Sequence, residues 1–264
     1  MLPRIVTALV GLPVLIGIVW VGGYALVALA SAAAAIAAWE LCRMADSWEQ
    51  RAFVLPAVAL TAALAASGYG VAIADGPLAY NLLVPAGALG AALTLLLLDQ
   101  RRQSLLATIL VTACIVVFVG GALFNASLFA GHSDGGDLVL FVLAVTFATD
   151  TGAYAVGRTI GSHKLAPSIS PGKTWEGAIG GLAAAIVTGA VSTLVFGFGS
   201  QWMVVAAIMG ITGQVGDLYV SKLKRRAGFD DSGAIFPGHG GMLDRLDSLS
   251  FNLIVIGLAA VALL

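Results

Sequence analysis

Three side chains near residue 220 have types and a spacing that suit phosphate chemistry. Asp217, Ser221 and Lys224 lie four and seven residues apart along the chain. If the apolar segment before them continues as a helix, all three lie on one of its faces. Asp244 and Asp247 also share a face if their segment is helical. Carboxylates without a neighbouring Cys or His suit a hard cation such as Mg²⁺, and Lys and Arg suit phosphate oxygens.

A glycine-rich loop lies between these two groups. Pro237-Gly238 and Gly240-Gly241 form a backbone whose N–H groups can approach an anion closely. His239, between the two pairs, suits a base or a metal ligand, and a hydrogen bond that merely orders the loop is an equal alternative. Carboxylates, cations and such a loop are together typical of a site that moves a phosphoryl or nucleotidyl group.

The competing interpretation of this segment is a solvated loop with surface ion pairs. That interpretation accounts for cations such as Lys222 or Arg226. It accounts poorly for Asp217, because an acid at the end of an apolar span is costly unless it is paired or functional. We therefore interpret residues 217–247 as a functional site.

A second polar segment lies upstream and has similar chemistry. Asp150 falls within or near the end of an apolar span, and Ser170, Lys173 and Thr174 belong to a Ser-Pro-Gly-Lys-Thr run just before the next span. The run is not a P-loop, because Pro167 stands where that motif needs glycine and no strand precedes it. Hydroxyls, a lysine and free N–H groups at a helix N-terminus still favour phosphate. A capped helix start with a snorkelling lysine is the alternative.

The composition shows what kind of scaffold must position these residues. Of the 264 residues, 59% are hydrophobic and only 10% are charged, against about 25% charged residues in a typical soluble domain. Mean hydropathy is +1.00. The chain therefore has enough apolar sequence to cross a bilayer many times. Its net charge of -1 gives no sign of a nucleic-acid partner, since such proteins are usually basic.

Apolar segments long enough to cross a membrane predict an all-α, polytopic integral membrane protein with about nine transmembrane helices. The first could be a signal peptide, but another apolar segment follows almost at once, so we interpret it as a retained helix. The nine expected spans are 5–21, 24–44, 53–74, 78–98, 105–130, 137–157, 176–198, 201–219 and 249–264.

The distribution of Lys and Arg predicts the orientation of these helices. All thirteen lie in or beside the N-terminal start and the segments 45–52, 99–104, 158–175 and 220–248. Cytoplasmic loops carry the excess of Lys and Arg. We therefore expect a bacterial-type inner (cytoplasmic) membrane protein with a cytoplasmic N-terminus. Its two long polar loops, and with them the site, then face the cytoplasm, where nucleotides are found.

The two polar segments resemble one known family. The stretch from Ser221 to Asp247 is similar to the motif of phosphatidate cytidylyltransferases, also called CDP-diacylglycerol synthases. The segments beginning at Asp150 and Ser170 also look like that family, so the resemblance covers roughly the C-terminal half. The positions that fill the motif are Ser221, Lys224, Arg225, Asp231, Pro237, His239, Gly240, Gly241, Asp244, Arg245 and Asp247.

The resemblance implies a reaction in which CTP and phosphatidic acid give CDP-diacylglycerol and pyrophosphate. It also implies dependence on Mg²⁺, with one or two metal ions, and a homodimer. In this interpretation three aspartates, Asp217, Asp244 and Asp247, hold the metal and act with Lys173 in catalysis. The expected substrate-binding residues are Ser170, Lys173, Thr174, Ser221, Lys224, Arg225, His239, Gly240, Gly241, Arg245 and Asp150.

The expected organisation has two parts and leaves other functions open. Residues 1–136 would form an N-terminal transmembrane region, and residues 137–264 a catalytic region with cytoplasmic loops 158–175 and 220–248. A CTP-dependent kinase of a lipid alcohol such as a polyprenol would share the nucleotide and metal groups. A secondary transporter would use Asp150 and Asp217 as coupling-ion sites, but it would not need the basic loop.

One position departs from the family motif. Asp230 stands where the family carries a lysine before Asp231. Either that lysine is peripheral, or its loss is offset by Lys222 and Arg226 on the same segment. Both interpretations predict that the site tolerates Asp230, because exposed charges interact weakly through water and salt.

Overall fold

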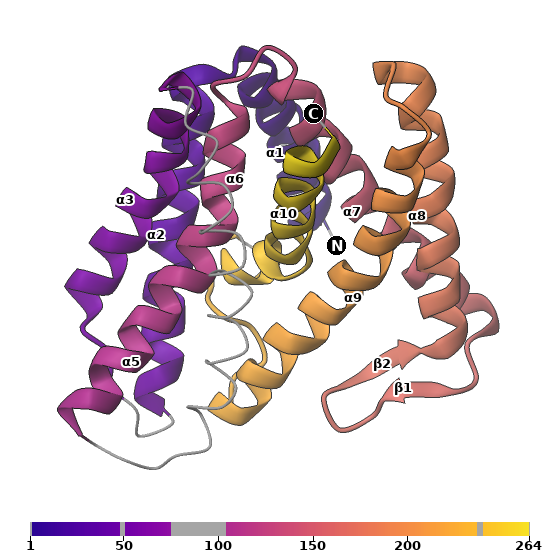
Figure 1. Ribbon diagram of the computed structural model, residues 1–264. Coiled ribbons are helices and arrows are strands. Elements are labelled where there is room, and N and C mark those ends of the chain that lie inside the picture. The colour runs from indigo at the N-terminus through magenta and orange to yellow at the C-terminus, as the bar shows by residue number, and fades with distance from the viewer. Residues whose placement is uncertain (1, 48–50, 75–103, 237–239, 264) are drawn as a thin grey trace.

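The computed structural model describes residues 2–47, 51–74, 104–236 and 240–263. These residues form a helical protein with one small β-hairpin (Figure 1). The predicted span 78–98 lies outside the described residues. The elements are α1 Leu2–Val21, α2 Gly23–Ser47, α3 Val54–Ile73, α5 Leu105–Ile115, the π-helix η1 Val116–Gly120, α6 Gly121–Phe129, α7 Gly135–Ile160, β1 Lys164–Ala166, β2 Ser170–Thr174, α8 Trp175–Phe196, α9 Gln201–Ala227 and α10 Leu243–Leu263.

Seven helical segments in the described residues are long and apolar enough to cross a membrane. They are α2, α3, the continuous run Leu105–Phe129 that joins α5, η1 and α6, and then α7, α8, α9 and α10. The apolar stretch of α1, Leu9–Val21, is shorter. The chain is thus an all-α type of multi-pass membrane protein, as predicted. The expected number of nine spans is not confirmed.

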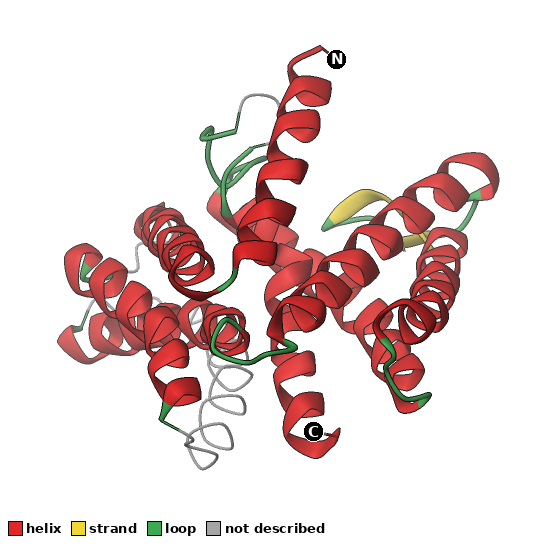
Figure 2. Ribbon diagram, turned by 90° about the horizontal axis from the view of Figure 1, so that it is seen from above, coloured by secondary structure: helices red, strands yellow, loops and turns green. Residues whose placement is uncertain are grey.

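The first polar segment folds into a hairpin that joins α7 to α8. Helix α7 continues to Ile160, beyond the predicted end of its span, and β1 and β2 then pair antiparallel with Lys164 opposite Thr174. Thr174 is the N-cap of α8, and its hydroxyl accepts a 3.1 Å hydrogen bond from the N–H of Gly177. Figure 2, in which strands are yellow, shows this hairpin beside the helices. The predicted loop 158–175 is therefore an ordered element that ends in a helix cap.

The second polar segment is shorter as a loop than predicted. Helix α9 runs to Ala227 and ends at Gly228, whose φ of 75° is left-handed and suits glycine. Helix α10 already begins at Leu243. Asp217, Ser221 and Lys224 therefore lie on one continuous helix, and Asp244 and Asp247 lie in the first turns of the next. Both conditions on which the sequence interpretation depended are met.

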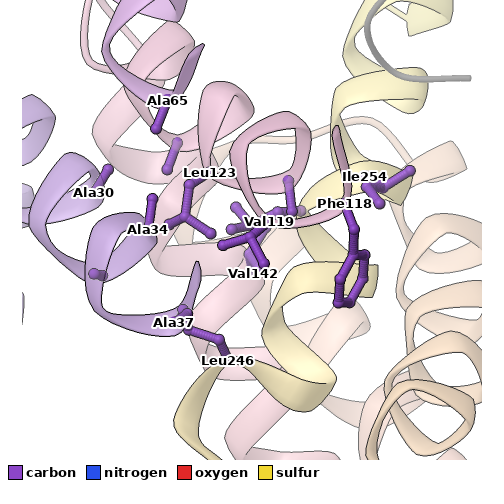
Figure 3. Close-up of a cluster of buried hydrophobic side chains, with 14 of the residues drawn as sticks. Ala30, Ala34, Ala37, Ala65, Phe118, Val119, Leu123, Val142, Leu246 and Ile254 are labelled. Atoms are coloured by element: carbon purple, nitrogen blue, oxygen red, sulfur yellow. The ribbon is translucent and has the colours of Figure 1, made fainter. Parts of the chain in front are cut away.

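The helices share one apolar core that includes both halves of the sequence. Its members come from α1, α2, α3, α5, η1, α6, α7, α8, α9 and α10. On α2, Ala34 and Ala37 are fully buried, and Figure 3 places Ala34 beside Leu123 of α6 and Ala37 beside Leu246 of α10. Small residues allow helix backbones to approach closely, which matters where lipid leaves little hydrophobic drive for helix association. The N-terminal helices thus pack against the C-terminal ones that carry the polar motifs.

A buried polar network fastens three of the C-terminal helices to one another. The amide nitrogen of Asn252 on α10 donates to the hydroxyl of Thr146 on α7 at 2.9 Å. The hydroxyl of Thr212 on α9 donates to the Asn252 amide oxygen at 2.9 Å. Hydrogen bonds between membrane helices satisfy groups that lipid cannot. The three helices that carry Asp150, Asp217 and the α10 aspartates are therefore held at fixed distances from one another.

The close approach of α3 to α6 gives a test of this packing. A Cβ added to Gly68 would overlap the backbone carbonyl of Phe124 and lie 2.9 Å from the backbone nitrogen of Leu128. We expect Gly68→Ala to force the helices apart and lower the free energy of unfolding by about 1–3 kcal/mol. The matched control is Gly70→Ala on the same helix, where a Cβ meets nothing within 4 Å. Thermal unfolding in detergent should separate the variants, and equal melting temperatures would contradict the packing.

Candidate active site

The two polar segments meet at an ion pair between the hairpin and α9. Lys173 on β2 lies with its Nζ atom 2.8 Å from Oδ2 of Asp217. The same ammonium donates a 3.4 Å hydrogen bond to the carbonyl of Gln214. Ser221 donates from its hydroxyl to Oδ1 of Asp217 at 3.2 Å. Residues far apart in the sequence, each selected for phosphate chemistry, thus form one site.

Two further aspartates face the same region from neighbouring helices. Asp150 on α7 is exposed and lies within electrostatic range of Asp217, Lys173 and Arg245. Asp247 on α10 is half-buried and lies within electrostatic range of Asp217 and Asp150. Three carboxylates from three helices therefore surround a region that also receives two cationic side chains. Like charges gathered at the end of apolar helices are costly unless cations compensate them.

Asp244, predicted as a metal ligand, has a different environment in the structure. Its Oδ1 accepts from Lys224 Nζ at 2.6 Å, and both side chains are almost fully buried. Its Oδ2 lies 2.8 Å from the N–H of Ser232, 3.0 Å from the Ser232 hydroxyl and 2.9 Å from the N–H of Gly241. Both oxygens are thus occupied by donors of the protein. In this arrangement Asp244 and Lys224 fasten Ser232 and Gly241, in the loop before α10, to α9.

The glycines of this loop allow that close approach. Gly240 has a φ of 80°, and a Cβ on it would lie 2.5 Å from Oδ2 of Asp244. A Cβ on Gly241 would overlap the Ser232 hydroxyl. These glycines were expected to bring backbone N–H groups near a substrate anion, and here the N–H of Gly241 binds a carboxylate of the protein itself. His239, a further predicted residue, lies outside the described residues.

The remaining predicted residues lie at the rim of the site. Arg225 pairs through Nη1 with Oδ1 of Asp230 and donates to the carbonyl of Phe229 at 3.3 Å. Arg245 is exposed on α10. Ser170 begins β2 and is half-buried. Thr174 is 5% exposed and caps α8, which agrees with the helix-cap alternative for that residue.

The sequence interpretation missed Glu40 on α2. This side chain is fully buried. Its Oε1 accepts from the N–H of Met242 at 2.9 Å, and its Oε2 accepts from the N–H of Leu243 at 2.8 Å. The signal was present, because Glu40 is an acid inside the apolar span 24–44, and such residues are rare unless paired or functional. The partners of Glu40 could not be predicted from the sequence, since Met242 and Leu243 lie about 200 positions away.

The donor set can be tested against the expected Mg²⁺. No group of three or more His, Cys, Asp or Glu side chains among the described residues is placed to hold a metal ion by itself. Mg²⁺ rarely needs such a group, because one or two carboxylates together with water and substrate phosphates usually bind it. Oxygen donors without a nearby thiolate are the ligands that this ion prefers. The aspartates that surround the site therefore fit Mg²⁺ carried with a nucleotide.

Comparison with known proteins shows the family to which the chain belongs. Phosphatidate cytidylyltransferase from Staphylococcus haemolyticus is 48% identical to this chain over 128 residues, which are 47% of the chain and 49% of that relative. The enzyme of the same name from Brucella suis is 45% identical over 135 residues, half of each protein. The chain therefore spans about half the length of the curated relatives that it matches. A model of the cytidylyltransferase family, in contrast, matches residues 2–263, so that the chain as a whole belongs to the cytidylyltransferase family.

Proposed function

We propose that this protein transfers the cytidylyl group of CTP to phosphatidic acid, giving CDP-diacylglycerol and pyrophosphate for phospholipid biosynthesis. The observation that carries the proposal is the contact between Lys173 and Asp217, which joins the two polar segments into one site at the ends of membrane helices. Family membership and the names of the relatives support the same reaction. A lipid substrate also suits a site built on transmembrane helices.

In the proposed reaction, a phosphate oxygen of phosphatidic acid attacks the α-phosphorus of CTP, and the bond to pyrophosphate breaks. The nucleophile is already anionic near neutral pH, so no strong general base is needed. The protein's contribution is to position two anions and to stabilise the charge that develops. Lys173 and Arg245, which face the aspartates from two different elements, bind phosphate oxygens. Lys173 exchanges its Asp217 partner for the substrate as the nucleotide enters.

Magnesium is the cofactor that this proposal includes. Asp217 and Asp247 would hold the ion, with Asp150 near enough to contribute. When bound, it neutralises the triphosphate and makes pyrophosphate a better leaving group. Asp244, with both oxygens bound by protein donors, would keep the adjoining loop in place. This assignment differs from the one expected from sequence by exchanging Asp244 for Asp150.

The proposal places the protein in the cytoplasmic membrane with the site facing the cytoplasm. Phosphatidic acid would enter sideways from the inner leaflet, with its acyl chains among the helices. Large apolar side chains on α8, including Ile179, Val187 and Leu194, are exposed and suit contact with lipid or with a second copy of the chain in a homodimer. A lipid-alcohol kinase would use similar groups but would release CDP.

Product analysis tests the proposed reaction directly. Purified full-length protein in detergent would be incubated with phosphatidic acid, labelled CTP and Mg²⁺. The expected products are CDP-diacylglycerol and pyrophosphate in equal amounts. Release of CDP together with a phosphorylated lipid alcohol, when a polyprenol replaces phosphatidic acid, would favour the kinase. If neither product forms, both enzymatic functions are rejected.

Asp217→Asn should reduce turnover by about 100-fold or more, because the change keeps the volume but removes a charge that a bound Mg²⁺ needs. The melting temperature in detergent should change little, since Asp217 is partly exposed. Asp134→Asn is the matched control. Asp134 is exposed in the turn before α7 and makes no cap hydrogen bond with its side chain, so this variant should retain full activity. Near wild-type turnover of Asp217→Asn at limiting Mg²⁺ would show that the acid is structural.

Cysteine labelling tests the orientation. Cys42 and Cys114 are buried thiols and would be replaced first. A single cysteine at Ala234, exposed in the loop before α10, should then be shielded from an impermeant thiol reagent in intact cells. One at Ser133, exposed in the turn between α6 and α7, should react. The reverse pattern would place the site on the outer face and would contradict the proposed access to cytoplasmic CTP.

Asp230→Lys should leave turnover within a few-fold of wild type. Asp230 is 92% exposed and pairs with Arg225, and exposed ion pairs contribute only about 0–1 kcal/mol. The apparent Michaelis constant for CTP should fall modestly at low ionic strength and not at high ionic strength. The added lysine should matter more when Arg226 is also changed to Ala. A large gain in turnover from Asp230→Lys alone would show that this chain is adapted to a different lipid acceptor.

A further inference from the structure

Glu40 is a buried acid whose role the proposed reaction does not explain. It lies on α2, in the half of the chain that carries none of the predicted site residues, and it is fully buried. Burying an ionised carboxylate without partners is very costly. Its partners all lie in one distant segment, the loop before α10 and the first residues of that helix. The contact therefore joins the N-terminal helices to the segment that carries the catalytic motif.

The carboxylate binds the N-terminus of α10 in the way that a capping group does. Met242 and Leu243 donate their N–H groups to its two oxygens at 2.9 and 2.8 Å. The first N–H groups of a helix have no partner within the helix, and the positive end of its dipole favours a negative charge. No side chain within α10 supplies this charge to both groups. Glu40 thus determines where, and in which direction, α10 begins.

The loop leaves space for Glu40 and for little else. A Cβ on Gly233 would lie 2.5 Å from Oε1 of Glu40, and one on Gly241 would overlap the same atom. Ser232 lies with its hydroxyl 2.7 Å from Oε2 of Glu40 and 3.0 Å from Oδ2 of Asp244. Because a hydroxyl has one proton, it donates to one carboxylate at a time. The carboxylates of Glu40 and Asp244 therefore lie on either side of the Ser232 hydroxyl. Backbone N–H groups and Lys224 stabilise the two negative charges there.

These contacts form a continuous path from α2 to the site. The path runs from Glu40 through Ser232 to Asp244, and from Asp244 to Lys224 on α9, one helical turn beyond Ser221. Asp247 lies one turn along α10 from Asp244 and within electrostatic range of Asp217. Arg245 lies between them on the same turn. The position of the α10 start therefore determines where Arg245 and Asp247 stand relative to Asp217.

We propose that Glu40 is a positioning residue of the active site, which fixes the first turn of α10 and thereby places Arg245 and Asp247 opposite Asp217. This inference rests on the proposed function, because it assigns Glu40 a role in that same site. Glu40 touches neither substrate nor metal. It acts through the helix that it caps, as residues that support metal ligands commonly do.

Glu40→Gln is the first test, because it keeps the volume and removes the charge. Glutamine has one oxygen and one NH₂ group, so the NH₂ group would face one of the two backbone N–H donors and could not accept its hydrogen bond. We expect kcat to fall by about 10- to 100-fold. The KM for CTP should rise by a smaller factor, because Arg245 moves with α10 whereas Lys173 and Asp217 stand on other elements. Glu40→Asp keeps the charge but is one methylene shorter, so it should recover part of kcat. Asp46→Asn, an exposed acid on the same helix, should behave as wild type.

Hydrogen exchange gives a readout that does not depend on activity. In Glu40→Gln, the backbone amides of residues 232–236 and 240–243 should exchange faster than in the wild type, with no change in β1 and β2. If that variant does not fold, Ser232→Ala should show the same changes to a smaller extent. Wild-type exchange and wild-type kcat in whichever variant folds would overturn the role of Glu40. The proposed function fails separately, if the wild-type protein forms no CDP-diacylglycerol.

Discussion

The cost of keeping a carboxylate among apolar helices governs how this protein is built. An acid near the end of a membrane helix must find a cation, a set of N–H donors or water. Asp217 forms an ion pair with Lys173. Asp244 forms one with Lys224 and accepts from two backbone N–H groups. Glu40 accepts from the N–H groups at the start of α10. Each of these pairings joins two different elements of the fold. The charged residues therefore fold the polar end of the molecule, in addition to their proposed work on phosphates.

The three aspartates Asp244, Asp217 and Asp150 differ in their hydrogen-bond partners, and this difference suits them to different roles. Asp244 has both oxygens bound by donors of the protein, and a metal would have to displace several of them. Asp217 has one ammonium and one hydroxyl, partners that a substrate phosphate and a cation can replace without unfolding a loop. Asp150 is exposed on the surface of α7. In the proposed function, the same chemical group is thus a structural anchor in one place and a ligand for substrate or metal in another.

Much of this arrangement could be predicted from the sequence, for identifiable physical reasons. The length of the apolar segments predicted the membrane helices, and the spacing of Asp217, Ser221 and Lys224 predicted their common face. The helix ends could not be placed as well, because α9 continues as a charged helix to Ala227 beyond its apolar stretch. The hairpin was missed because two very short strands leave no periodic pattern. Glu40 was missed because its contacts join positions some 200 residues apart, which no local pattern reports.

The hairpin and the loop before α10 hold the site in different ways, and the difference bears on how substrates enter. Lys173 reaches Asp217 from β2, the five-residue strand directly before α8. Of the residues in this strand, only Thr174 is buried. Segments of this kind have low local stability and open easily. The α10 start, in contrast, is fixed by two buried carboxylates, those of Asp244 and of Glu40 on α2. In the proposed reaction, an entering nucleotide would therefore replace Asp217 as the partner of Lys173 on the less buried side of the site, while Asp247 keeps its place on α10.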